Sequence, residues 1–219
     1  MNRDLVVLSS CQNSKAALQV IVGNHSKLTL RAISADFFVH PNSDPGCLKQ
    51  SHGILQSQRN RFDHALVVFD RDGCGSNDSP EKLETYVEAI LNNQGGWNGR
   101  ARAIVIDPEL EAWVWSDSPH VDNALGWNGR IPNLRSWMQD EGYLVAGQFK
   151  PEDPKTALQE ALKVAKIRRT SAIYADLARN VGYARCTDRS FLRLCSILKE
   201  WFGVEPPGAP RQQKLPGQF

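Results

Sequence analysis

The chain has 219 residues, of which 41% are hydrophobic and 23% charged, and its formal net charge is +2. This composition is typical of a folded, water-soluble protein, and the length suits one α/β domain with or without a small appendage. No apolar stretch approaches the roughly 18 residues that mark a membrane span, and residues 1–4 lead into a predicted strand without the apolar region of a signal peptide. We therefore expect a cytoplasmic protein that binds no membrane.

The charges are distributed unevenly along the chain. Residues 1–149 hold 13 Lys and Arg against 17 Asp and Glu, whereas residues 150–201 hold 11 against 6. An acidic half joined to a basic half suits a polyanionic substrate held beside a cation, although solvated helix faces alone produce a skew of this size. The five cysteines have neither the paired spacing of a zinc site nor the density of a disulfide scaffold.

Apolar runs and turn residues alternate through the first part of the chain. Short apolar runs bounded by polar residues indicate buried strands, and an apolar period of 3.6 residues indicates a helix. In chain order we expect a strand at 5–8, a helix at 13–22, a strand at 28–33 that residues 37–39 extend, a loop at 41–46, a helix at 47–60 and a strand from residue 65.

The clearest predicted helix follows this strand. Asp78 or Ser79 serves as its cap, Pro80 takes its first position, and Gly95-Gly96 ends it. We then expect a strand at 103–106 and a further helix that starts at Pro108 with acidic residues in its first turn. This alternation favours a mostly parallel sheet covered on both faces.

From about residue 118 the pattern is entirely helical. We expect helices at 131–138, 154–166, 171–177 and 189–201. The predicted organisation is an α/β core at 1–117, a helical and basic part at 118–203, and a disordered tail at 204–219 that is rich in Pro, Gly and Gln. The pentapeptide Gly-Trp-Asn-Gly-Arg occurs at 96–100 and 126–130, and we interpret both copies as the same kind of turn.

Two carboxylates follow the most apolar predicted strand. The run at 66–69 ends at Asp70 and Asp72, and residues i and i+2 of a strand point to the same face, so both can reach one hard cation. Gly73 and Gly75 permit a sharp turn there. Asp-x-Asp-Gly is also ordinary turn chemistry, because Asp hydrogen-bonds its own backbone.

A second acidic segment follows the next predicted strand. Neighbouring parallel strands present their carboxyl ends at one edge, so Asp70, Asp72 and either Glu109 or Glu111 predict a Mg²⁺ or Mn²⁺ site. The two glutamates also suit the first turn of a helix for electrostatic reasons alone. On a helix they cannot both face one cation, and we expect Glu111 to be the inward one.

Together these segments resemble the TOPRIM family, the metal-binding domain of topoisomerases, primases and OLD-type nucleases. The resemblance rests on Asp70-Arg71-Asp72 after a buried strand, on Glu109-Leu110-Glu111-Ala112-Trp113, and on Pro154-Lys155 at the start of a basic helical part. It covers about residues 4–200 and is strongest to small stand-alone TOPRIM-like proteins of bacterial defence loci. It implies a TOPRIM-like, mostly parallel sheet with flanking helices, followed by a helical C-terminal part.

The resemblance implies a nuclease that hydrolyses nucleic-acid phosphodiesters with Mg²⁺ or Mn²⁺ in anti-phage defence, with DNA favoured over RNA and with protein partners in a defence complex. The implied catalytic residues are Asp70, Asp72 and Glu111, and the implied metal ligands are Asp70, Asp72, Glu109 and Glu111. The residues implied to hold the phosphate backbone are Lys155, Arg168, Arg169 and Arg189.

One departure from the family pattern keeps alternatives open. TOPRIM enzymes carry a glutamate at the end of the first strand, where this chain reads Leu8-Ser9-Ser10-Cys11-Gln12. A TOPRIM-like fold without turnover, which serves as a nucleic-acid-binding or assembly subunit of a defence complex, is therefore the main alternative. Asp-Arg-Asp-Gly also resembles the first motif of haloacid-dehalogenase-type phosphatases, and Asp-x-Asp resembles the manganese site of sugar-nucleotide transferases.

Overall fold

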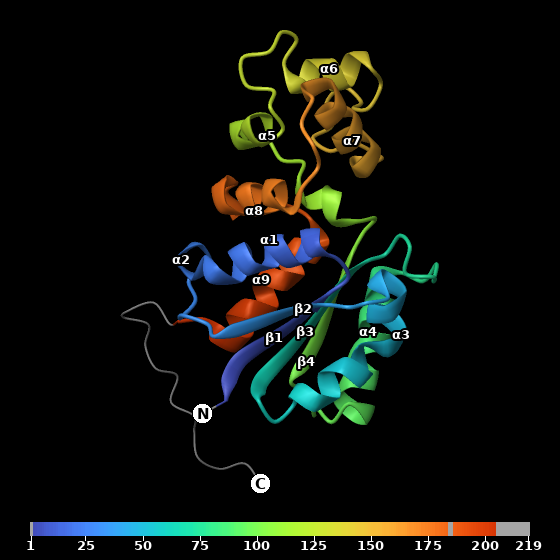
Figure 1. The fold of residues 1–219 in the computed structure, drawn as a ribbon, viewed down its shortest axis with the longest axis vertical. Helices are drawn as coiled ribbons and strands as arrows, with labels where there is room; N and C mark the ends of the chain where they lie inside the picture. The colour runs from blue at the N-terminus through green and yellow to red at the C-terminus, as the bar shows by residue number, and fades with distance from the viewer. Residues whose placement is uncertain (1, 184–185, 205–219) are drawn as a thin grey trace, which may run out of the picture.

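The computed structural model describes residues 2–183 and 186–204, and at its centre is a four-stranded parallel sheet (Figure 1). In the order in which they lie side by side, the strands are β2 (Ala35–Val39), β1 (Arg3–Ser9), β3 (Phe62–Asp70) and β4 (Ala101–Ile106). The register pairs Asp70 with Ile106. Because the strands are parallel, they all end at the same edge, which we call the carboxyl edge of the sheet.

The sheet is buried on both faces because its central strands are apolar at almost every position. In β3, Leu66 and Val68 pack into the core on one face, while Val67 and Phe69 pack into the core on the other. A parallel strand that is covered on both faces needs such a continuous apolar run, in place of alternating apolar and polar residues. The strand predicted from this run is therefore confirmed.

Helices cover both faces of the sheet (Figure 1). On one face lie α1 (Gln12–Gly23), α8 (Ser171–Asn180) and α9 (Arg189–Phe202), which share a single hydrophobic core with the strands. On the other face lie α3 (Ser43–Leu55) and α4 (Pro80–Ala89). The predicted α/β class with a parallel sheet and flanking helices is confirmed.

The segment after residue 118 places three helices beyond the carboxyl edge, at one end of the molecule (Figure 1). These are α5 (Pro119–Ala124), α6 (Leu134–Asp140) and α7 (Pro154–Ala165). The chain then returns to the sheet with α8 and α9, so the core on that face contains residues from both sides of the predicted boundary at residue 117. Four shorter elements complete the described chain, namely α2 (His25–Leu28), η1 (Gln56–Gln58), η2 (Ile90–Gln94) and η3 (Leu110–Trp113).

None of the helices among the described residues has both the length and the apolar character that crossing a bilayer requires. The tail predicted at 204–219 lies outside the described residues except for its first position.

The strand β4 lies at one edge of the sheet, and its outward backbone groups are capped by side chains of α4. The Ala103 N–H donates to Glu88 Oε1 and the Val105 N–H to Glu84 Oε1, each at 3.0 Å. Arg193 and Arg189 of α9 neutralise these carboxylates across the sheet edge. An uncovered edge would pair with other chains, and this ladder of side chains closes it.

The predicted strand at 28–33 is wrong. The short helix α2 ends at Leu28, Thr29 is left-handed with φ 58°, and the strand that joins the sheet is β2 at 35–39. Leu28 and Leu30 are nevertheless buried, because Leu30 forms a bridge to Gly203 and Arg31 donates its backbone N–H to the Phe202 carbonyl at the end of α9. A contact with the far end of the chain therefore explains the apolar residues that indicated a strand.

The loop predicted at 41–46 is also wrong in part, because α3 begins at Ser43. Pro45 stands in the first turn, where the absence of its N–H costs no helical hydrogen bond. A Cβ at Gly46 would lie 2.1 Å from Nδ1 of His40, so only glycine permits this close approach. Residues that are typical of a loop thus open a helix, and they carry Asp44 to the carboxyl edge.

The two copies of Gly-Trp-Asn-Gly-Arg form equivalent turns, as predicted. In both copies the glycines have positive φ, the tryptophan is buried, and the arginine N–H donates to the tryptophan carbonyl, at 3.0 Å in one copy and 3.1 Å in the other. Each arginine also lies over its tryptophan ring, with 5.1 and 5.4 Å between guanidinium carbon and ring centroid. The repeat is therefore explained by recurrent turn chemistry.

Candidate metal and phosphate site

The carboxyl edge of the sheet holds an unpaired buried carboxylate oxygen. Asp70 is the last residue of β3 and is half-buried. Its Oδ1 atom is buried and has no hydrogen-bond partner in the described part of the chain. A buried acceptor without a partner costs free energy, so such an atom calls for a ligand or a functional explanation.

The surroundings of Asp70 disfavour its negative charge. Burial, together with the charges of Asp44, Glu111 and Glu109, raises the pKa of Asp70 well above the usual range of an aspartate. These four acids therefore lie close enough to interact electrostatically, and they come from α3, β3 and the segment after β4. A cluster of like charges of this kind is stabilised by a cation.

Asp44 is a member of this cluster that sequence reasoning did not identify. Its Oδ1 accepts a hydrogen bond from the backbone N–H of Asp70 at 2.8 Å. Because residues 41–46 were predicted to be a loop, nothing placed Asp44 near the other acids. The only available signal was the pattern Ser43-Asp44-Pro45, which can also open a helix.

Both glutamates after β4 face the cluster, so the expectation that only Glu111 points inward is wrong. The predicted helix from Pro108 does not form. Glu109 is extended, with φ −161° and ψ 172°, and a single short turn, η3, begins at Leu110. This backbone lets both side chains point inward, and Glu109 and Glu111 are 8% and 1% exposed.

Basic and hydroxyl side chains of the helical part hold the two glutamates. Lys155 Nζ, in the first turn of α7, lies 2.5 Å from Glu109 Oε2. Arg169 pairs with Glu111, and the Tyr174 hydroxyl donates to Glu111 Oε1 at 2.5 Å. Each glutamate therefore has a basic side chain beside it.

The pKa values follow from these contacts. Burial raises the pKa of Glu109 against the opposing effect of the hydrogen bond from Lys155, and the same hydrogen bond raises the pKa of the Lys155 ammonium group. Burial and the neighbouring Glu111 also raise the pKa of the Tyr174 hydroxyl far above its usual value, so Tyr174 stays a proton donor.

Asp72 lies on the open side of the cluster. It is exposed and lines a groove of about 510 Å³ together with Glu109, Glu152, Asp153 and Lys155. Four carboxylates and one ammonium group make this groove acidic. A phosphate group entering it would be repelled unless a cation came with it.

The residues expected to hold a phosphate backbone are divided between two places. Lys155 and Arg169 contact the glutamates of the cluster, and Arg168 is exposed beside Arg169. Arg189, in contrast, is paired with Glu81 and Glu84 of α4. The geometry therefore gives Arg189 a role in closing the sheet edge.

The donor set of the cluster has the chemistry that Mg²⁺ and Mn²⁺ require, because all its ligand atoms are carboxylate oxygens. The buried, unpartnered Oδ1 of Asp70 fits such an ion. In the part of the chain that the structure describes, however, no three His, Cys, Asp or Glu side chains are already arranged around one position for a metal ion. Lys155 and Arg169 each pair with an oxygen of one of the two glutamates.

Comparison of the chain with protein-family models, with curated proteins and with solved structures gives no significant match.

Proposed function

We propose that the protein is a TOPRIM-like, divalent-metal-dependent nuclease that hydrolyses nucleic-acid phosphodiesters at the carboxyl edge of its sheet. The observation that supports this proposal most is the buried, unpartnered Oδ1 of Asp70 within a cluster of four acids. A carboxylate is costly in such a place without a cation, and active sites are where such costs are found.

In this proposal, Asp70, Asp72, Glu109 and Glu111 hold Mg²⁺ or Mn²⁺. When bound, the cation supplies a water molecule of lowered pKa and polarises a phosphate oxygen. Lys155 and Arg169 lie beside Glu109 and Glu111, so they are placed to contact the phosphate backbone once the glutamates turn to the cation. Arg168 adds an exposed positive charge next to them.

Asp44 partly replaces the glutamate that the end of β1 lacks. It brings a further carboxylate to the carboxyl edge, although it comes from α3. Its side chain holds the Asp70 backbone, so we assign it the role of positioning Asp70. Ser9 and Ser10, at the end of β1, offer no acid.

A second function has one observation in its favour. Both glutamates are engaged by basic side chains, which is the arrangement expected of a site that no longer turns over. The protein would then be a TOPRIM-like nucleic-acid-binding or assembly subunit in a defence complex. This version predicts binding of DNA or RNA that does not depend on a divalent cation.

A cleavage assay separates these functions. The intact chain, Asp70→Asn and Asp63→Asn are incubated with end-labelled single-stranded DNA, double-stranded DNA and RNA, in Mn²⁺, in Mg²⁺ or in a chelator. Asp63 is an exposed aspartate at the opposite end of the same strand, which makes it the matched control. We expect cation-dependent cleavage by the native chain and by Asp63→Asn, and a loss of at least about 100-fold in Asp70→Asn.

Equal cleavage by the native chain and Asp70→Asn would contradict the proposal. If no substrate is cleaved but an oligonucleotide is bound equally with and without the cation, the non-catalytic function is the correct one.

A further inference from the structure

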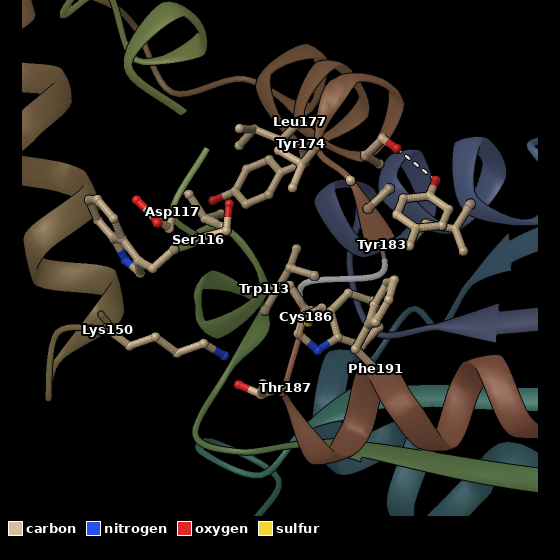
Figure 2. Close-up of a pocket in the computed structure, with 18 of the residues that line it drawn as sticks. Trp113, Ser116, Asp117, Lys150, Tyr174, Leu177, Tyr183, Cys186, Thr187 and Phe191 are labelled. Atoms are coloured by element: carbon tan, nitrogen blue, oxygen red, sulfur yellow. Dashed lines mark hydrogen bonds between the residues drawn. The ribbon is translucent and has the colours of Figure 1, made fainter. Parts of the chain in front are cut away.

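A separate cavity of about 350 Å³ lies between the helices that cover one face of the sheet. Its walls come from η3 and the segment after it, from α8 and the residues that follow α8, and from the start of α9 (Figure 2). Apolar side chains form most of its surface. Cavities that bind small molecules have this character, with a few polar groups among apolar and aromatic ones.

Aromatic side chains in fixed orientations form the walls. The Trp113 Nε1–H donates to the Ser190 hydroxyl at 2.8 Å. The Tyr183 hydroxyl donates to the Ala178 carbonyl at 2.6 Å, the bond marked by the dashed line in Figure 2. Phe191 meets both rings edge to face, with centroids 5.5 Å from Trp113 and 5.4 Å from Tyr183. The cavity is therefore preformed, and a ligand would pay little to order it.

The charged groups of the lining are paired or open to solvent, which indicates an uncharged ligand. Asp117 is exposed and lies 4.0 Å from Arg135 Nε. Lys150 extends across toward Thr187 in Figure 2, and its Nζ is already paired with Asp188 at 3.0 Å, so its charge is balanced. Ser116 also lines the cavity, and its Oγ is buried without a hydrogen-bond partner in the described residues. This oxygen is not exposed to the cavity, so a ligand would meet mainly the apolar and aromatic atoms of the lining.

An exposed aromatic ring lies in the cavity lining. Phe149 is 65% exposed although it contributes to the wall. A large apolar side chain left in solvent at a binding cavity gains free energy when a ligand covers it. The volume lies near the lower end of ligand-binding pockets, which limits the occupant to one or two rings.

We propose that this cavity binds a small, uncharged, planar aromatic molecule of one or two rings, which packs against the aromatic side chains of the lining. The site is distinct from the carboxylate cluster and does not depend on the nuclease proposal. Among the described residues the two sites share one wall residue, Tyr174, whose ring lines the cavity while its hydroxyl bonds to Glu111.

Saturation-transfer NMR on the full chain tests this proposal, with adenine, benzimidazole and phenol as probes at millimolar concentration. We expect at least one probe to bind the native protein. In Ala178→Phe, the new side chain fills the cavity and should lower the signal at least fivefold. Ala172→Phe is the matched control, because Ala172 is exposed on the same helix and lies outside the cavity lining.

One further variant keeps the test decisive if Ala178→Phe does not fold. A Cβ at Gly182, which also lines the cavity, would meet no atom within 4 Å, so Gly182→Phe fills space without a clash at its first atom. It should lower the signal in the same way.

Binding that is unchanged in both filling variants, or the absence of binding for all three probes, would overturn the proposal. Asp70→Asn should leave probe binding unchanged, and a loss of binding there would instead assign the probe to the carboxylate cluster.

Discussion

Asp70 is a half-buried acid whose negative charge is disfavoured by its surroundings. Its carboxyl lies at the end of a buried strand, among three other acids, and one of its oxygens has no partner. Nothing in the packing of β3 requires an acid there. The cost is explained if the carboxylate serves a cation, since perturbed acids gather at functional sites.

The raised pKa of Asp70 predicts a pH-dependent gain in stability on its removal. A carboxyl whose folded pKa exceeds its unfolded value binds its proton more tightly when folded, so stability falls as pH rises from the unfolded pKa through the folded pKa. Without metal, Asp70→Asn should therefore raise the Tm by a few degrees at pH 7, as about 1 kcal/mol would in a chain of this size.

The gain should shrink toward pH 4, because the carboxyl is then protonated in the folded state and about half protonated in the unfolded chain. Thermal unfolding followed by circular dichroism in a chelator measures the difference in Tm between the native chain and Asp70→Asn at pH 4 and at pH 7. A native chain more stable than Asp70→Asn at pH 7 would show that the charge is already compensated.

Glu111 is a second buried charge, and Arg169 is its main counter-ion. We expect Arg169→Met to destabilise the fold by about 3 kcal/mol, because it leaves a buried carboxylate with only the Tyr174 hydroxyl. The adjacent Arg168 is exposed, and Arg168→Met should change stability by no more than about 0.5 kcal/mol.

Urea unfolding of the two variants gives this comparison. Combining Arg169→Met with Glu111→Gln should restore part of the loss, because the uncompensated charge is then gone. Equal effects of the two arginine substitutions would show that the ion pair contributes nothing.

Among the elements, the edge strand β4 depends most on its neighbours. Glu84 of α4 is 2% exposed, accepts the Val105 N–H and pairs with Arg189 and Arg193. Glu84→Ala should cost about 3 kcal/mol, because it removes the acceptor of a buried backbone donor and separates two arginines from a buried partner.

Two variants of the same helix serve as controls for Glu84→Ala. Glu81 pairs with Arg189 but is exposed, so Glu81→Ala should destabilise the fold much less than Glu84→Ala does. Glu84→Gln keeps an acceptor for Val105 and should fall between the two. Guanidinium unfolding orders the three variants, and a Glu81→Ala as severe as Glu84→Ala would argue against the ladder at the sheet edge.

The elements also show where sequence reasoning succeeds and fails. Strands β1, β3 and β4 were predictable because burial on both faces demands a continuous apolar run. The strand predicted at 28–33 was wrong because the apolar residues of this segment pack against the end of α9, a contact between distant parts of the chain. The loop predicted at 41–46 was partly wrong because Pro45 and Gly46, which are typical of loops, lie in the first turn of α3. Glycine is required at position 46 because His40 packs against it.

At the scale of the whole molecule, the sheet gathers the candidate site and the helical part completes it. The sequence allows one to predict that acids after neighbouring strands lie at the same edge, because parallel strands bring their carboxyl ends together. These acids are Asp70, Asp72, Glu109 and Glu111. Asp44, Tyr174 and the pairing of Lys155 with Glu109 depend on where α3, α7 and α8 pack. No local pattern encodes such packing.

The same limit applies to the cavity beside Trp113. Its walls come from segments around residues 113, 149, 174 and 191, which the sequence does not connect. The basic residues of the C-terminal half were predicted to hold a polyanion. In the described structure several of them pair with acids of the first half. The charge asymmetry of the chain is thus partly an internal complementarity.

The most direct test of the proposed function is Mn²⁺ binding by isothermal titration calorimetry. The native chain is compared with Asp70→Asn and Asp72→Ala at the carboxyl edge, and with Asp63→Asn at the opposite end of β3. We expect the native chain and Asp63→Asn to bind Mn²⁺ at micromolar to low-millimolar levels, as is typical of a site that keeps several water ligands. The two edge variants should lose this binding. A native chain that binds no Mn²⁺, or an Asp70→Asn variant that binds it as well as the native chain does, would contradict the metal site and with it the nuclease.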